Sequence, residues 1–242
     1  MSILPAMKKS SSSLRPLKFQ LSYLPHTAGS CLVSMGQTKV LCVASVENNV
    51  PPHAEEKGNG WVTAEYAMLP HAGDRRSSRG KVSSGGRVQE ISRLVGRSLR
   101  ASVNLADLAG YTITVDCDVI RADGGTRTAS INGGFVAMVM ALKGLHKKGL
   151  LNRWPVKHFV GAVSVGLIKK KAVLDICYLE DKDADTDMNL VMANDGRFIE
   201  IQGTAENDPF SDDQLKQMLS LGRRGLRQIM ARQQQVLGRL PV

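Results

Sequence analysis

The sequence predicts a mixed α/β or α+β fold that divides near residue 150. In both halves of the chain, strand-like runs precede amphipathic or apolar helical patterns. The 242 residues are 43% hydrophobic and 22% charged, values typical of a globular protein that buries its own core without disulfide staples. Residues 1–14, with a serine run behind two lysines, predict a flexible tail, so the two folded halves are assigned to 15–150 and 151–242.

Three kinds of pattern predict the elements of the first half. Residues 30–46 turn at Gly36-Gln37 between an alternating run and a continuously apolar one, which predicts a β-hairpin. Apolar residues at i, i+3 and i+4 spacing predict an amphipathic helix over 87–104, and the mostly apolar run 129–146 predicts a buried helix. Further strands are expected at 61–69 and 111–120, and a loop rich in Gly, Ser and Arg at 71–86.

The second half repeats this arrangement more loosely, with strands followed by one long helix. That helix begins after Ser211, because Ser211 and Gln214 have the spacing of a capping box that satisfies the free amides of a first turn. An acidic turn interrupts the strands. The expected strands are 160–168, 172–179, 189–192 and 198–201.

The chain carries a large positive charge. Lysine and arginine number 32 against 22 aspartate and glutamate, a formal net charge of +10 with a pI near 9.6. A surplus of this size favours a polyanionic partner, most often nucleic acid. More than half of it falls between His71 and Arg100. The arginines Arg75, Arg76 and Arg79 in this basic loop suit a phosphodiester backbone, and a solvated charged loop is the alternative.

Cysteine usage and hydropathy indicate the compartment. The four cysteines are scattered through apolar, strand-like runs without a CxxC pair, which predicts buried free thiols in a reducing cytoplasm rather than a zinc site. The longest apolar run, 135–142, is far shorter than the roughly 20 residues of a membrane-spanning helix. We therefore expect a cytoplasmic chain without a membrane segment.

Two Gly-Gly segments precede predicted helices, where they are placed to bind anions. Gly124-Gly125 lies between a strand and a helix and is followed by Thr126 and Arg127. Glycine lets the backbone approach a ligand, the free amides of a helix N-terminus attract an anion, and an Arg fork matches phosphate. Gly85-Gly86 stands in the same relation to Arg87. The sequence leaves open whether both segments face one phosphate or are ordinary turns whose arginines face water.

Acidic residues gather directly after a strand of the second half, in the run 180–187. Mg²⁺ takes oxygen ligands, commonly one or two carboxylates completed by phosphates and water. Asp181 and Asp187 stand near the two ends of this run and are spaced to meet across a turn around one ion, with an acidic surface turn as the alternative. Asp116 and Asp118 form a separate pair on one face of a predicted strand.

Other catalytic signatures are missing from the sequence. It contains no HExxH and no GxSxG motif, which argues against a zinc protease and a serine hydrolase. A nuclease that hydrolyses RNA with two metal ions normally has a denser set of carboxylates. One sparse acidic run beside two candidate phosphate cradles instead favours a reaction in which phosphate itself is the nucleophile.

Several longer blocks resemble the ribonuclease PH family. They are GWVTAEYAMLP (60–70), GGRVQEISRLVGRSLRA (85–101), DCDVIRADGGTRTASINGGFVA (116–137), DADTDMN (183–189) and IEIQGTAENDPFS (199–211), and the resemblance covers nearly the whole chain. Members of this family are phosphorolytic 3′→5′ exoribonucleases. They transfer the 3′-terminal nucleotides of tRNA precursors to inorganic phosphate and release nucleoside diphosphates.

The resemblance implies a role for each of the residues singled out above. The implied phosphate ligands are Arg87, Gly125, Thr126 and Arg127, and the implied catalytic set is Arg87, Arg127, Asp181 and Asp187. The resemblance places Mg²⁺, or Mn²⁺, on Asp181 and Asp187, and RNA on Arg75, Arg76 and Arg79.

The resemblance also implies an architecture and an assembly. The fold would be two related α/β subdomains like domain 2 of ribosomal protein S5, and six chains would form a ring as a trimer of dimers. The partners would be RNA and phosphate, with neither DNA nor a membrane. The alternative is a non-catalytic, RNA-binding ring subunit of an exosome-like assembly, which the presence of both arginines and both aspartates disfavours.

Overall fold

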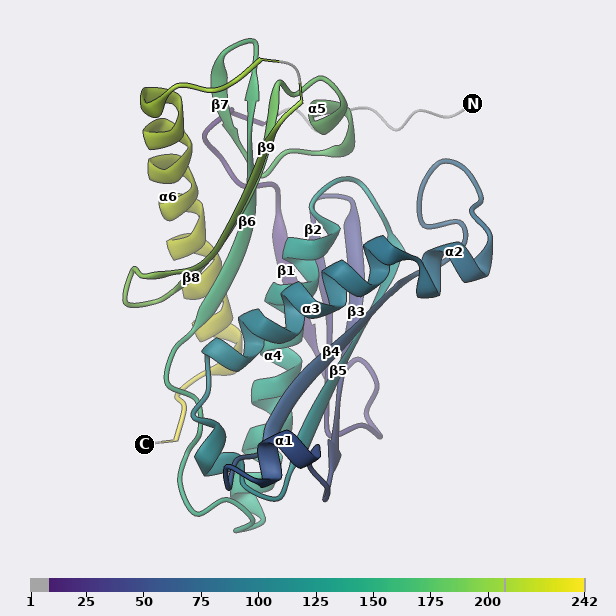
Figure 1. Cartoon of the computed structure of the whole chain (residues 1–242), viewed down its shortest axis with the longest axis vertical. Helices are drawn as coiled ribbons and strands as arrows, with labels where there is room; N and C mark the ends of the chain where they lie inside the picture. Colours follow the sequence, from purple (N-terminus) through teal and green to yellow (C-terminus); the bar gives the residue numbers. More distant parts are fainter. Residues whose placement is uncertain (1–8, 207, 242) are drawn as a thin grey trace.

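The computed structural model describes residues 9–206 and 208–241, which form two β-sheets with a long helix between them (Figure 1). The first sheet has the strand order β1-β2-β3-β5-β4, in which β4 and β5 are parallel and the other neighbours antiparallel. Its strands are β1 (Leu17–Leu21), β2 (Gly29–Met35), β3 (Thr38–Glu47), β4 (Trp61–Met68) and β5 (Thr112–Arg121). The second sheet is antiparallel, in the order β7-β6-β8-β9. It contains β6 (Val160–Ile168), β7 (Lys171–Leu174), β8 (Thr186–Ala193) and β9 (Phe198–Ala205).

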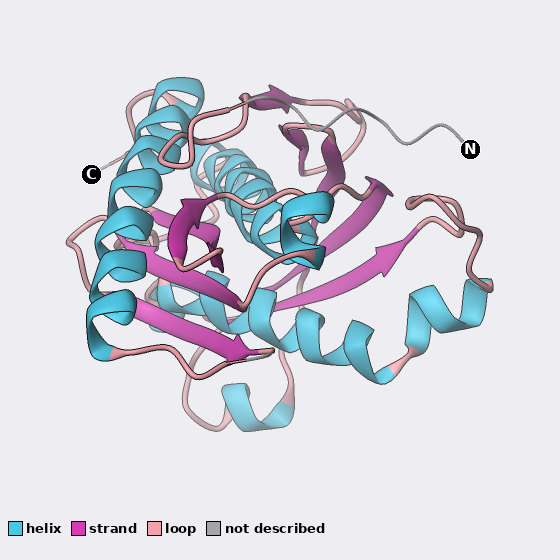
Figure 2. Ribbon diagram, turned by 90° about the horizontal axis from the view of Figure 1, so that it is seen from above, coloured by secondary structure: helices cyan, strands magenta, loops and turns pink. Residues whose placement is uncertain are grey.

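Three long helices pack against these sheets, one between them and two on the outside. The central helix α4 (Thr126–Lys147) packs against β2, β3 and β5 of the first sheet and against β6 of the second. On the outside, α3 (Gly86–Ala101) lies on β4 and reaches β9, and α6 (Asp212–Leu237) covers β6 and β7 (Figure 2). The short helices are α1 (Pro52–Glu55), α2 (Arg79–Ser84), a 3-10 turn (Leu105–Leu108) and α5 (Tyr178–Lys182).

The position of α4 explains its composition. By length and hydropathy it is the one helix in the described residues that is able to cross a membrane, yet 83% of its apolar window is buried between the two sheets. A helix that is apolar on all sides belongs in a core, and the sequence pattern predicts such a helix here. The mixed α/β architecture, the hairpin at Gly36-Gln37 and the capped last helix are likewise confirmed.

Two predicted segments differ from the structure. The loop predicted over 71–86 contains the short helix α2, which buries none of its residues, so no apolar periodicity indicated it. The strand predicted over 172–179 ends at Leu174, because Asp175 takes a left-handed φ of 53° and the chain then enters α5. This early end places the acidic run on a helix and a following strand rather than on one turn.

The predicted tail also needs a correction in its second part. Residues 1–8 of the predicted tail 1–14 lie outside the described residues. Residues 9–14 run beside β7, where the Leu174 amide donates to the Ser11 carbonyl at 2.7 Å and Lys9 Nζ donates to the Leu174 carbonyl at 2.6 Å. This segment therefore joins the second half of the fold.

The buried cysteines should make the stability of the fold depend on pH in the alkaline range. All four are free and buried, and burial raises the pKa of the Cys31 thiol to about 12 from its ordinary 9.0. The unfolded chain loses this proton first, so the contribution of Cys31 to the free energy of unfolding is fully present below pH 9.0 and is lost as the pH rises toward 12. Urea unfolding across this range measures the decline. Cys31→Ala makes it shallower, and an equally steep decline in this variant contradicts the prediction.

Candidate active site

The turn between β5 and α4 forms the predicted anion cradle. Gly124 and Gly125 have left-handed φ angles of 73° and 64°, which glycine adopts without strain. A Cβ atom on Gly124 would lie 2.6 Å from the Ile176 carbonyl oxygen, so this turn packs directly on the second half of the chain. Gly125 is the N-cap of α4 and provides no capping side chain. The first amides of α4 therefore remain free for a ligand.

Tyr66 of β4 holds the first residue of α4. Its hydroxyl lies 2.8 Å from Thr126 Oγ1. Its backbone amide donates a hydrogen bond to Ser92 Oγ of α3 at 3.0 Å, which joins β4 to α3. Burial raises the pKa of Tyr66, and the charges of Arg87 and Arg127 act against this rise. Tyr66 thus contacts the N-terminus of α4 and lies near both Arg87 of α3 and Arg127 of α4.

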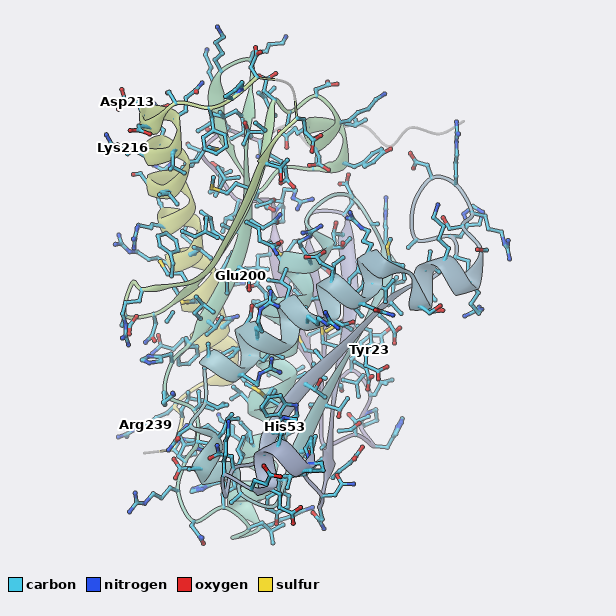
Figure 3. All side chains as sticks on the ribbon, in the orientation of Figure 1. Tyr23, His53, Glu200, Asp213, Lys216 and Arg239 are labelled. Carbon is cyan, nitrogen blue, oxygen red and sulfur yellow. The ribbon has the colours of Figure 1, made fainter. Side chains whose placement is uncertain are left out.

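Arg127 is oriented by polar side chains of α3 and β9. Its Nη1 donates to Gln202 Oε1 at 3.2 Å and lies 3.8 Å from Glu90 Oε1. Gln202 Nε2 in turn donates to Glu90 at 3.3 Å and to Glu200 at 3.1 Å. Glu200 lies beside α3 (Figure 3), where Arg97 pairs with it at 2.8 Å. This network leaves 19% of the Arg127 side chain exposed, so the guanidinium is held but still accessible.

The two predicted carboxylates lie within the field of the two arginines. Burial raises the pKa of Asp181 in α5, and Arg87 and Arg127 lower it. Burial also raises the pKa of Asp187 in β8, the neighbouring Asp181 charge raises it further, and Arg127, Asn189 and Arg87 lower it. The charges of Arg87 and Arg127 therefore act on both Asp181 and Asp187, and these four groups form one electrostatic cluster.

The donor set of this cluster suits a hard cation. Asp181 and Asp187 provide carboxylate oxygens only, and repulsion between them is relieved by a positive ion. Within residues 9–206 and 208–241, no group of three or more His, Cys, Asp and Glu side chains is arranged to hold a metal. An ion at these two carboxylates would therefore complete its shell with water and phosphate oxygens, which fits Mg²⁺ or Mn²⁺ and not a structural zinc.

The predicted RNA-binding arginines are separate from this cluster. Arg75, Arg76 and Arg79 are exposed, on the loop before α2 and on α2 itself, and none of them makes an ion pair in the part of the chain that the structure describes. Both views place α2 at the end of the molecule opposite α6 (Figures 1 and 2). In the chain, α2 is followed directly by α3, whose first turn contains Arg87.

Asp116 and Asp118 do not join the site. They alternate along β5 with the buried Val115 and Cys117, so they lie on the face of the first sheet that is turned away from α4. Burial raises the pKa of Asp116, and the charges of Glu65 and Asp118 raise it further. This pair is a feature of the open sheet face.

Sequence reasoning missed the residues that orient the cluster. Tyr66, Glu90 and Gln202 lie in blocks that carry the family resemblance, but no spacing in the sequence indicates that β4, α3 and β9 meet at the start of α4. Their hydrogen-bonded partners on α4 are 60 residues from Tyr66 and 75 residues from Gln202. Only the folded chain reveals them.

Comparison with known proteins identifies the class. Residues 13–143 match the 3′ exoribonuclease family, domain 1, and residues 158–225 match the 3′ exoribonuclease family, domain 2. Ribonuclease PH of Halalkalibacterium halodurans is 47% identical over 236 residues, which cover 96% of this chain and 91% of that protein.

Solved structures share the fold. Rice Rrp46 superposes with a TM-score of 0.76 at 18% identity, covering 95% of this chain and 98% of its own. The Archaeoglobus fulgidus exosome with RNA bound to the active site gives 0.76 at 18% identity, covering 93% of this chain and 90% of its own.

The family matches cover more than half of the chain, and the chain belongs to the 3′ exoribonuclease family. Within this family it is a phosphorolytic enzyme, and the resemblance to ribonuclease PH is confirmed.

Proposed function

We propose that this chain shortens the 3′ ends of tRNA precursors in the cytoplasm, using inorganic phosphate and a divalent cation, Mg²⁺ or Mn²⁺, and releasing nucleoside diphosphates. One observation carries the proposal: arginines from the starts of two helices and aspartates from two further elements form one cluster. Two positive groups suit a phosphate nucleophile, and two carboxylates suit the cation that phosphoryl transfer requires.

The phosphate would lie against the N-terminus of α4. The free first-turn amides, the Thr126 hydroxyl held by Tyr66, and the guanidinium groups of Arg127 and Arg87 provide donors for its oxygens. One phosphate oxygen attacks the phosphorus of the last phosphodiester, a new P–O bond forms, and the bond to the leaving 3′ oxygen breaks. The proton of the attacking hydrogen phosphate passes to that 3′ oxygen, leaving a 3′-hydroxyl on the shortened RNA.

The chain contributes positioning and charge rather than a covalent intermediate. Holding phosphate and RNA in line supplies about 7–11 kcal/mol in well-aligned reactions. Asp181 and Asp187 would hold the cation, which would neutralise charge on the transferring phosphoryl group. Gln202 and Glu90 fix the direction of Arg127, so that this arginine needs little rearrangement when phosphate arrives.

RNA would reach the site over the basic loop. Arg75, Arg76 and Arg79 are exposed and suit phosphodiester contacts that are independent of base sequence. We also propose a ring of six chains, in which the loops of several chains bind one RNA multivalently. The exosome-like scaffold reading is less well supported, because the 47% identical relative is a ribonuclease and the four charged groups are all present.

The identity of the product tests the function. An RNA with a few nucleotides beyond CCA is incubated with and without inorganic phosphate and Mg²⁺. We expect nucleoside diphosphates that appear only when phosphate is present. Nucleoside monophosphates formed without phosphate would establish hydrolysis and overturn the proposal. Bound RNA that is never shortened would indicate a scaffold subunit instead.

A further inference from the structure

Arg15 lies buried beneath the turn that precedes α4, where the two halves of the chain meet. Only 1% of its side chain is exposed. Its Nη2 donates to Asp175 Oδ1 at 2.7 Å, and its backbone amide donates to Asp175 Oδ2 at 2.8 Å. The same guanidinium also donates to the carbonyl oxygens of Asp123 and Gly124 in the turn. Arg15 therefore binds one residue of the second half and two residues of the anion cradle.

The Arg15–Asp175 ion pair contributes little net stability, because burying two charged groups carries a large desolvation penalty. Burial alone lowers the pKa of Arg15, but the Asp175 carboxylate, together with the charges of Asp123 and Cys177, raises the pKa above its ordinary value. Asp175 is completely buried and adopts a left-handed φ of 53°, a conformation that costs energy for a residue other than glycine. Buried ion pairs are often no more stabilising than apolar residues of the same volume, which points to a geometric role.

The same turn is held by three further hydrogen bonds. Thr38 Oγ1 donates to the Gly124 carbonyl at 2.6 Å and accepts from the Asp123 amide at 2.9 Å. The Asp123 carboxylate accepts from the amide of Tyr178 at 3.3 Å. Tyr178 is the first residue of α5, which carries Asp181. The turn is thus joined on one side to the start of α4 and on the other to the helix of the first carboxylate.

We propose that Arg15 is a positioning residue that sets the distance between the phosphate-binding start of α4 and the carboxylate of α5. It does so by holding the turn 123–125 against Asp175. This inference rests on the proposed function, because it assigns the start of α4 to phosphate and Asp181 to the cation.

A lysine at position 15 keeps the charge but loses the fork that reaches Asp175 and the turn together. We expect Arg15→Lys to fold and to raise the KM for phosphate about tenfold, since displacements near 1 Å cost reactions up to about 100-fold. The KM for RNA should change less than twofold. Thr38→Val removes the two contacts of Thr38 with the turn and should shift the same constant in the same direction.

The matched control is Arg223→Lys. Arg223 also donates to a backbone carbonyl, that of Gly196 at 2.6 Å, but it lies on α6 outside the cluster. Circular dichroism and thermal melting establish that each variant is folded. A phosphate KM within twofold of wild type in folded Arg15→Lys overturns the positioning role. If Arg15→Lys does not fold, Thr38→Val decides the question by the same criterion. A wild-type enzyme that needs no phosphate refutes the proposed function instead, so the two failures are distinguishable.

Discussion

Asp187→Asn lowers kcat for phosphorolysis by about 10²–10³-fold, the usual cost of removing one group that stabilises transition-state charge. The amide keeps the size and the hydrogen-bonding shape of the carboxylate but removes its negative charge. Asp181 is then the one remaining carboxylate assigned to the cation, so the cation binds more weakly. The Mg²⁺ concentration that gives half the maximal rate therefore rises. Titration of the rate against Mg²⁺, at saturating RNA and phosphate, measures both effects.

The stability of this variant excludes a trivial explanation. Burial and the Asp181 charge raise the pKa of Asp187, which means that ionised Asp187 destabilises the folded chain near neutral pH. We therefore expect the Tm of Asp187→Asn to equal or exceed that of the wild type, as is common where an active site stores strain.

The control for charge loss is Asp195→Asn. Asp195 is an exposed carboxylate that pairs with Arg197 at 2.6 Å outside the cluster. Its removal should leave kcat within twofold, because surface ion pairs contribute little. An Asp187→Asn enzyme with wild-type kcat and unchanged Mg²⁺ dependence contradicts the assignment of Asp187 to the cation.

The sequence predicts those parts of the site that depend on local structure. Gly124-Gly125 before an apolar helix defines a turn, a free helix N-terminus and the place of Arg127 within a few residues. The acidic run singles out Asp181 and Asp187 by residue type, although they lie on α5 and β8 and not on the one turn that was predicted. Short-range rules suffice here because each feature follows from neighbours in the chain.

The groups that orient the site depend on contacts distant in the sequence. The ion pair of Arg15 joins residues 160 positions apart. Neither the arginine at position 15 nor its neighbours in the sequence indicate such a partner. From the sequence, Arg15 is predicted only to be the first residue of the folded chain. Likewise, α2 buries nothing, so it leaves no apolar pattern to read. Element type and local motifs are thus predictable, while the orientation of functional side chains requires the tertiary structure.

Arg127→Ala is expected to lower kcat/KM for phosphate by about 10²–10³-fold, because it removes a guanidinium held at the start of α4 by Gln202 and Glu90. Steady-state rates at varied phosphate and fixed RNA measure this loss, and sizing of the variant shows whether its assembly equals that of the wild type.

Arg127→Lys separates charge from geometry. Lysine keeps the positive charge but cannot bind a phosphate with two parallel hydrogen bonds while it also contacts Gln202, so its activity should fall between those of Arg127→Ala and the wild type. Arg197→Ala is the matched control, because the Arg197 side chain is 77% exposed and pairs only with Asp195 among the described residues. If Arg127→Ala and Arg197→Ala show the same phosphate dependence, Arg127 does not bind the nucleophile, and the anion cradle must then consist of the α4 amides, Thr126 and Arg87 alone.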